Sequence, residues 1–189
     1  MGARVREGIE CRAGAGRVTV SFQAPGYVAA VSGAEDLRPG ILVRHMRDGD
    51  VERVAEIESF AFSTPWKATT FKLLLDRPGA VLMVLEVPPA RVAGYAVLWC
   101  IQDQGELANI AVIPEFRNQR LGAYLLDHIL NEAQERTVES LYLEVRVSNF
   151  RARSMYASRG FEEIGVRRDY YENPREDARI LMKRLTPTP

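Results

Sequence analysis

The sequence predicts an α/β fold in which helices flank a central sheet of about six to seven strands. From Ile41 onward, the spacing of apolar residues alternates between periods of two and of about 3.6 residues, as strands and helices require. An amphipathic helix pattern also follows directly on a short apolar run and a polar turn between Asn109 and Ala123. With 189 residues, 47% of them hydrophobic, the chain can bury one substantial core. We predict one domain over residues 41–186.

The residues before this domain have a different composition. Glycine, alanine and arginine dominate the first part, and turn-forming Pro–Gly pairs occur at residues 25–26 and 39–40. Residues 18–22 are the one segment with the pattern of a short strand. We therefore predict that residues 1–40 form an N-terminal extension that is weakly ordered or loosely docked.

The domain begins with a predicted strand and two helices. Residues 41–46 form the strand candidate, and a second helix over residues 69–75 follows the break at Pro65 and Trp66. Between them, Asp48 is the expected cap of a first helix. The apolar positions of that first helix recur at helical spacing, at Val51, Val54, Ile57 and Phe60.

A hairpin, a further strand and a long helix come next. Residues 80–87 and 92–102 predict two strands joined through a turn at residues 88–91, and residues 106–113 predict the following strand. Adjacent strands of this kind make a sheet. The helix after Gly122 has an apolar stripe that must pack on that sheet, at Leu125, Leu126, Ile129, Leu130 and Ala133.

The C-terminal part predicts three strands and one short helix. Residues 141–146 form a strand, and a helix over residues 149–159 ends at Gly160, a residue type favoured after a helix C-terminus. Residues 161–171 and 178–185 then complete the sheet.

The turn between Asn109 and Ala123 has the features of a phosphate-binding site. A helix start leaves its first backbone N–H groups without intrahelical acceptors and carries partial positive charge, so it can bind a pyrophosphate. The segment lacks the Gly-Lys-Ser/Thr ending of a nucleoside-triphosphate loop, and the chain has no Rossmann glycine triplet. The candidate phosphate ligands are Arg117, Asn118, Gln119, Arg120, Leu121, Gly122 and Ala123.

Composition excludes several other classes of protein. The 25 basic and 25 acidic residues cancel, so no global field attracts nucleic acid or an anionic membrane. Cys11 and Cys100 lie far apart, and His45 and His128 form no metal-binding pattern, which argues against a disulfide scaffold and a metal site. No apolar run reaches the length of a membrane span. We expect a cytoplasmic protein without direct contacts to nucleic acid or membrane.

The order of these elements resembles the GNAT family of N-acetyltransferases, which bind acetyl-coenzyme A (acetyl-CoA). The family motif is Gln or Arg, two residues, Gly, one residue, and Gly or Ala, and residues 117–122 match it except that Arg120 replaces the first glycine. Six further blocks look like the RimI-type, ribosomal-protein-alanine branch of the family: ESFAFSTPW (58–66), LANIAVIPEFR (107–117), LYLEVRVSN (141–149), MYASRGF (155–161), RRDYY (167–171) and REDARILM (175–182).

The resemblance implies a fold and an activity. The fold is the GNAT fold, with a mixed, mostly antiparallel sheet. The activity is transfer of an acetyl group from the co-substrate acetyl-CoA to the N-terminal α-amine of alanine in a small-subunit ribosomal protein. The resemblance also implies a further partner in some relatives, the machinery that makes threonylcarbamoyl-modified transfer RNA.

The departure at Arg120 leaves several interpretations open. Glycine is favoured where the backbone takes positive φ or approaches a ligand closely, and a β-carbon can crowd the phosphate. With helical backbone, the Arg120 N–H still points at the pyrophosphate. Its guanidinium can then bind a phosphate oxygen or remain on the surface without a role.

The resemblance implies roles for three residues in the second half of the site. Glu144 occupies the position of the general base, Tyr156 that of the proton donor, and Asn149 that of a pantetheine contact. Judged from the sequence pattern alone, Glu144 is an exposed strand residue, Tyr156 a helix aromatic packed on the sheet, and Asn149 a helix N-cap. A phenol with a reference pKa of about 10 is protonated at neutral pH and can donate a proton to a thiolate.

The strand ending at Val112 offers a binding edge for the pantetheine arm. Pantetheine carries amides, so backbone groups of Ile110, Ala111 and Val112 can bind it as an added strand. The alternative is an ordinary buried strand. The strand can be buried and also bind pantetheine if the neighbouring strand diverges.

The nature of the acceptor follows partly from energetics. An α-amine has a reference pKa near 8 and lysine about 10.4, so a neutral α-amine costs roughly 3 kcal/mol less to form. The candidate walls of a peptide groove are Pro65, Trp66, Arg167, Arg168, Tyr170 and Tyr171, residue types that also occur on strands without a ligand. Alternatives are an acetyltransferase for lysine or small amines, and a non-catalytic acetyl-CoA-binding scaffold.

Overall fold

The computed structural model describes residues 39–185, so the predicted extension lies outside the described residues except for its last two positions. Seven strands form one sheet in the order β1-β2-β3-β4-β5-β7-β6, and only β4 and β5 are parallel neighbours. The prediction of a mostly antiparallel sheet of six to seven strands is confirmed. The strands are β1 (Leu42–His45), β2 (Ala80–Val87), β3 (Arg91–Ile101), β4 (Gln104–Val112), β5 (Ser140–Arg146), β6 (Glu162–Glu172) and β7 (Arg175–Arg184).

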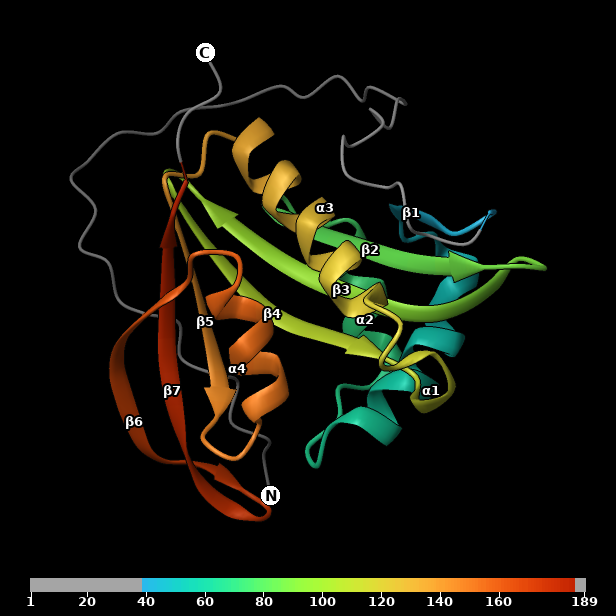
Figure 1. Ribbon diagram of the computed structural model, residues 1–189. Helices are drawn as coiled ribbons and strands as arrows, with labels where there is room; N and C mark the ends of the chain where they lie inside the picture. The colour runs from blue at the N-terminus through green and yellow to red at the C-terminus, as the bar shows by residue number, and fades with distance from the viewer. Residues whose placement is uncertain (1–38, 186–189) are drawn as a thin grey trace. The chain divides into compact units, whose positions relative to one another are not determined.

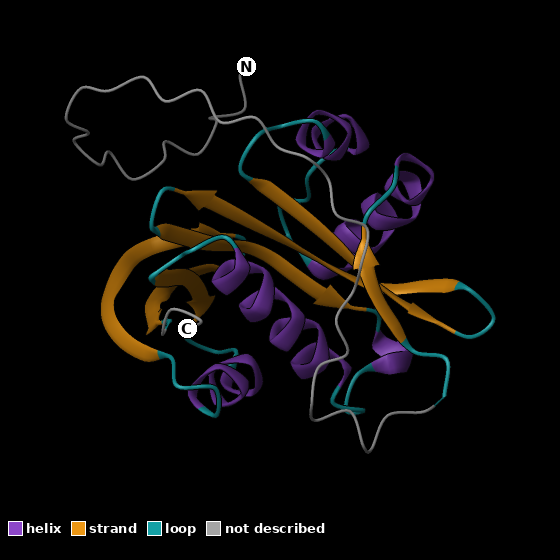
Figure 2. Ribbon diagram, turned by 90° about the horizontal axis from the view of Figure 1, so that it is seen from above, coloured by secondary structure: helices purple, strands orange, loops and turns teal. Residues whose placement is uncertain are grey.

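Four α-helices cover the sheet on both faces (Figures 1 and 2). α3 packs across β2, β3 and β4, with α4 on the same face, while α1 and α2 lie on the opposite face. Because both faces of β3 are covered, residues 92–98 are buried without interruption. The helices are α1 (Val51–Ala61), α2 (Ala68–Leu75), α3 (Leu121–Glu135) and α4 (Phe150–Ala157), and short 3-10 turns occupy Asp48–Asp50 and Pro114–Phe116.

The first helix differs from its prediction at both ends. A 3-10 turn occupies Asp48–Asp50, so the N-cap of α1 is Asp50 and not Asp48. Phe60 is 79% exposed, and the buried position is instead Glu58. Each step of three residues turns about 300°, so Phe60 points about 180° away from Val51. The prediction that Phe60 faces the core is therefore wrong.

The long helix packs as its stripe predicts. Leu125, Leu126, Ile129 and Ala133 are fully buried, and Leu130 is half-buried at the margin. Because this face of α3 lies on the central strands, its first turn is fixed directly above the end of β4.

The sheet opens between its two parallel strands (Figure 1). β4 and β5 pair only over residues 104–106 and 140–142. Beyond Glu106, β4 continues to pair with β3 as far as Val112. A bulge between β3 and β4 leaves Ala108 as an extra residue just past the last β4–β5 pair. Bulges increase local twist, and the divergence of the two strands begins at this point.

Candidate active site

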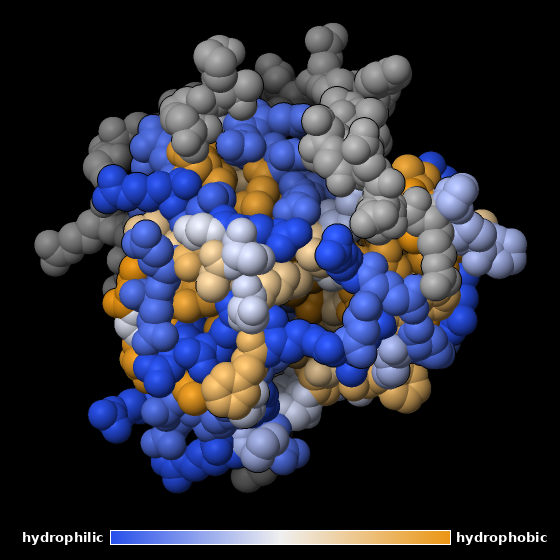
Figure 3. Space-filling model, in the orientation of Figure 1, coloured by the Kyte–Doolittle hydropathy of each residue, from blue (hydrophilic) through white to orange (hydrophobic). Residues whose placement is uncertain are grey.

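The opened edge of β4 is the centre of the candidate site. Ile110, Ala111 and Val112 pair with β3 on one side, while β5 has already diverged on the other. Figure 3 shows a hollow on this face, with apolar side chains at its floor and hydrophilic side chains around it, where Figure 1 places β4 between α3 and α4. This edge can pair with an extended ligand that carries amides, because the neighbouring strand diverges as such binding requires.

The turn before α3 has the backbone geometry that a phosphate site requires. Asn118 and Arg120 both have positive φ, of 65° and 60°. The first helical hydrogen bond runs from the Tyr124 N–H to the Arg120 carbonyl, so the N–H groups of residues 121–123 have no acceptor within the helix. Successive N–H groups in such a turn form a concave binding site for an anion.

Two side chains of the turn hold the turn itself. Nε of Arg117 donates to the Val112 carbonyl at 2.9 Å, which ties the turn to the end of β4. Nε2 of Gln119 donates to the Glu115 carbonyl at 3.0 Å. These contacts fix the backbone that would face a pyrophosphate, so the structure gives both residues a supporting role in the turn.

Gly122 is not required by the packing of the protein. A β-carbon added there would meet Sδ of Met155 at 3.8 Å and Cγ2 of Val112 at 3.9 Å, which are ordinary contacts. Glycine within a helix costs about 1 kcal/mol relative to alanine. The space beside its backbone is therefore open to a ligand.

The backbone of Arg120 is left-handed, so the interpretation that gives this residue a helical backbone is wrong. A side chain in this conformation costs about 1–2 kcal/mol, which glycine avoids. We therefore expect Arg120→Gly to stabilise the fold and to preserve or tighten acetyl-CoA binding. Scanning calorimetry and isothermal titration provide the two measurements.

Arg120→Ala is the matched control, because it removes the guanidinium and keeps the β-carbon. If the guanidinium itself binds phosphate, both variants will lose about 1.5–3 kcal/mol of binding free energy, and the loss will shrink as salt is added. That outcome would contradict binding through the backbone alone.

Glu144 lies on the half-buried face of β5. Leu141, Leu143 and Val145 are buried on the other face, which confirms the predicted alternation. The Glu144 side chain is 14% exposed, and its Oε1 forms an ion pair with Nη1 of Arg167 at 3.0 Å. Arg167 therefore fixes the carboxylate to which the family resemblance gives the role of base.

Tyr156 and Asn149 lie at the two ends of α4. Tyr156 is 5% exposed, its ring packs edge-on to Phe161 at 5.5 Å, and burial, with a smaller contribution from Tyr171, raises the pKa of its phenol well above 10. The phenol is thus protonated at neutral pH. Oδ1 of Asn149 accepts the Ala152 N–H at 3.1 Å, which confirms its interpretation as an N-cap.

The predicted walls of the peptide groove come together only in part. Tyr170 and Tyr171 pack edge-on at 5.0 Å, and the Tyr171 hydroxyl reaches the Glu144 carbonyl at 3.4 Å. The Arg167 guanidinium lies 5.5 Å from the Tyr170 ring centre, whereas Arg168 is simply exposed. On the other side, Trp66 packs against Phe71 at 5.7 Å while Pro65 is exposed.

A buried polar cluster beside the site is absent from the predictions. Glu58 on α1 is 1% exposed, and its carboxylate accepts hydrogen bonds from the Tyr95 hydroxyl, from Nδ2 of Asn109 at 3.0 Å and from the Trp66 N–H at 2.9 Å. The cluster joins α1, β3, β4 and the segment between α1 and α2. The sequence contains the signal, because Glu58 stands four residues after Val54 and seven after Val51 on the buried face.

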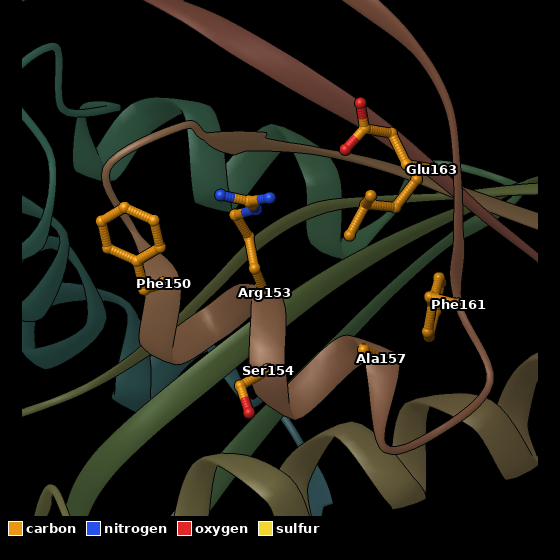
Figure 4. Close-up of a pocket in the computed structure, with 7 residues that line it drawn as sticks. Phe150, Arg153, Ser154, Ala157, Phe161 and Glu163 are labelled. Carbon is orange, nitrogen blue, oxygen red and sulfur yellow. The ribbon is translucent and has the colours of Figure 1, made fainter.

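A separate cavity of about 330 Å³ lies between α4 and the β6–β7 hairpin (Figure 4). It contains none of the predicted catalytic or cofactor-binding residues. In the close-up, Phe150 and Arg153 project from one side of α4 toward the strands. The lining residues are Phe150, Arg153, Ser154, Ala157, Phe161, Glu163 and Leu181.

The other candidate reactive groups have local structural partners. Nε2 of His45 pairs with Glu132 at 3.1 Å, and Nδ1 of His128 lies 3.0 Å from the Tyr124 carbonyl. Burial raises the pKa of the Cys100 thiol to about 11, so the thiol is a poor nucleophile at neutral pH. Cys11 lies outside the described residues. Within residues 39–185, no three His, Cys, Asp or Glu side chains are grouped to hold a metal, and no helix is long and apolar enough to cross a membrane.

The candidate site thus consists of a parallel strand pair that opens beside a left-handed turn and a helix start. The model of the Acetyltransferase (GNAT) family matches residues 51–161, which is more than half of the chain. The chain therefore belongs to the GNAT family of acetyltransferases, and the predicted family and enzyme class are confirmed.

Two bacterial relatives of the chain share one activity in their names. The ribosomal protein bS18-alanine N-acetyltransferase of Escherichia coli K12 is 36% identical over 135 residues, which cover 70% of this chain and 89% of that protein. A Bacillus subtilis protein, provisionally given the same name, is 39% identical over 140 residues, which cover 74% of this chain and 92% of its own length.

Solved structures share the fold of this chain. The crystal structure of the Escherichia coli ribosomal-protein-S18-alanine N-acetyltransferase superposes with a TM-score of 0.71 at 32% identity, covering 79% of this chain and 96% of that chain. The NatC complex bound to Gag peptide and CoA contains a chain with the same fold, with a TM-score of 0.68 at 18% identity, covering 77% of this chain and 99% of that chain.

Proposed function

We propose that the protein transfers an acetyl group from acetyl-CoA to the N-terminal α-amine of a ribosomal protein that begins with alanine, by direct attack of the amine. The opened edge of β4 beside the start of α3 is the observation that carries this proposal. It provides a strand edge for the pantetheine amides and helix-start N–H groups for the pyrophosphate, with Glu144 and Tyr156 on the elements that follow. A ribosomal protein substrate places the reaction in the cytoplasm.

The proposed cofactor contacts divide into two sets. Backbone groups of Ile110, Ala111 and Val112 bind the pantetheine arm, and Asn149 adds a contact from the start of α4. The turn at residues 117–123 binds the pyrophosphate. Acetyl-CoA supplies the activated acetyl group, and these residues hold and orient it.

Two side chains take part in the proton transfers of the reaction. The Glu144 carboxylate, oriented by Arg167, removes a proton from the incoming ammonium directly or through water. The neutral nitrogen then forms the amide bond as the carbon–sulfur bond breaks, and the second proton that the nitrogen loses passes to water. The buried Tyr156 phenol, which is protonated at neutral pH, donates the proton that the departing sulfur requires.

The names of the relatives support the choice of an N-terminal alanine. The Escherichia coli and Bacillus subtilis proteins both carry this specificity in their names, and the chain spans about nine-tenths of each. An α-ammonium also loses its proton more readily than a lysine ammonium, because its reference pKa is lower. One half-buried carboxylate can therefore serve as the base. Docking on the transfer-RNA threonylcarbamoyl machinery remains a prediction from the resemblance alone.

A panel of acceptors tests the proposal. The full chain is incubated with acetyl-CoA and peptides that begin with alanine, serine, glycine or methionine, with an N-terminally blocked peptide that contains lysine, and with a polyamine. We expect the alanine peptide to have the highest kcat/KM. Preference for the lysine peptide or the polyamine would support the small-amine alternative, and binding of acetyl-CoA without any transfer would support the scaffold.

A further inference from the structure

One side chain beside Glu144 contacts both sides of the candidate acceptor groove. Arg146 ends β5 and, two residues after Glu144, lies on the same face of the strand. Its Nη2 donates to Oγ of Ser63 at 3.2 Å, in the segment between α1 and α2. The same nitrogen donates to the Asn173 carbonyl at 3.0 Å, in the β6–β7 turn. Segments more than 100 residues apart in the sequence therefore meet at one guanidinium.

Further contacts fix the orientation of this guanidinium. Its Nη1 donates to the Pro174 carbonyl at 3.0 Å and pairs with Oε2 of Glu176 at 3.1 Å. The centre of the guanidinium lies 4.1 Å from the centre of the Tyr171 ring. Glu176 is itself held, because it accepts the N–H of Ser148 at 2.5 Å and the Ser148 hydroxyl at 3.1 Å.

Only an arginine can make this set of contacts. A guanidinium has five donors in a rigid planar fork and can stack on an aromatic ring, whereas an ammonium is a compact point charge. Here the fork donates to two carbonyls, a hydroxyl and a carboxylate while it lies over Tyr171. The side chain is 22% exposed, so water competes with these bonds only in part.

The segment between α1 and α2 is held at two points. The Trp66 N–H is bound by the buried carboxylate of Glu58, and Ser63 is bound by Arg146. The β6–β7 turn receives its contacts from Arg146 through two successive carbonyls. The guanidinium thus sets the separation of the two segments at the level of Glu144.

We infer that Arg146 is a positioning residue for the acceptor, which fixes the two segments around the base so that a peptide N-terminus can bind between them. The inference rests on the proposed function, because it concerns the acceptor of that reaction. Arg146 does not touch the reacting atoms in this role. Its loss should loosen the acceptor groove and leave the β4 edge and the 117–123 turn intact.

Arg146→Lys tests this role, since it retains the positive charge and removes the fork. We expect the KM for the alanine peptide to rise about 10- to 100-fold, the range for loss of charge-assisted hydrogen bonds. The KM for acetyl-CoA should change less than about twofold. Arg175→Lys is the matched control, because Arg175 lies on the β6–β7 hairpin that Arg146 contacts. Its side chain is 75% exposed and pairs with Asp169. It should leave both constants unchanged.

A second variant removes a single contact. Ser63→Ala breaks only the bond to the segment between α1 and α2 and leaves the β6–β7 turn held. We expect a smaller rise in the peptide KM with an unchanged thermal transition. This variant keeps the inference testable if Arg146→Lys fails to fold.

The alternative outcomes are distinct. An unchanged peptide KM in both variants, or an equal rise in the KM for acetyl-CoA, would overturn the positioning role. Wild-type protein without activity on any amine would be a failure of the proposed function. In that case amide hydrogen exchange still tests the positioning role of Arg146. If the guanidinium holds the two segments, Arg146→Lys must speed exchange in residues 62–67 and 172–175.

Discussion

Glu144→Gln and Tyr156→Phe should each reduce turnover about 10²- to 10⁴-fold and leave acetyl-CoA binding nearly intact. Each change removes one proton-transfer group, and general acid–base catalysis by a positioned side chain contributes a factor of this size. Glu144→Gln keeps the shape of the side chain beside Arg167, and Tyr156→Phe keeps the ring packed on Phe161. Neither variant removes a proposed contact to the pantetheine amides or to the pyrophosphate.

Steady-state kinetics measures turnover, and calorimetry on the same preparations measures acetyl-CoA binding. Tyr142→Phe is the matched control, because it removes a phenol from the part of β5 that still pairs with β4, outside the opened edge. The control should retain turnover within a few-fold of wild type. Near-normal turnover in Glu144→Gln and Tyr156→Phe would remove both residues from the proposed mechanism.

The second large effect concerns the buried cluster around Glu58. Glu58→Ala should lower the free energy of unfolding by more than about 3 kcal/mol. The change leaves the Tyr95 hydroxyl, the Asn109 amide and the Trp66 N–H without their carboxylate acceptor, and each buried unsatisfied group costs about 1–3 kcal/mol. The side chain also leaves a cavity in a site that is 1% exposed.

Denaturant unfolding measures this loss, and Glu56→Ala is the control on the same helix. The Glu56 side chain is 60% exposed and pairs with Arg53, so its removal should change stability by no more than about 0.5 kcal/mol. A loss for Glu58→Ala no greater than that of the control would contradict the account of the cluster.

The periodicity of the sequence predicts most of the fold because most of its elements bury one face. β5 alternates between buried and half-buried residues, and the stripe on α3 is fully buried apart from Leu130. Hydropathy fails on α1, where an apolar residue is exposed and a carboxylate is buried. Helical geometry places Phe60 opposite Val51 and Glu58 on the buried face, but only the hydrogen-bond donors on β3, β4 and the neighbouring segment explain why a carboxylate is stable there.

The candidate site is predictable where it is built from adjacent residues. The turn before α3 and the cap at Asn149 can be read from local sequence, since each depends on residues only a few positions apart. The left-handed conformation of Arg120 cannot be read in this way, because arginine rarely adopts it. The contact of Arg146 with Ser63 and Asn173 depends on three segments brought together by the tertiary fold.

The most direct measurement places two amines in competition within one molecule. A peptide with a free N-terminal alanine and an internal lysine is incubated with acetyl-CoA and the full chain, and fragment masses locate the acetyl group. The proposed mechanism predicts acetylation of the alanine α-amine and its loss in Glu144→Gln. Acetylation of the lysine, or modification of the α-amine that is equally fast with Glu144→Gln, would contradict it.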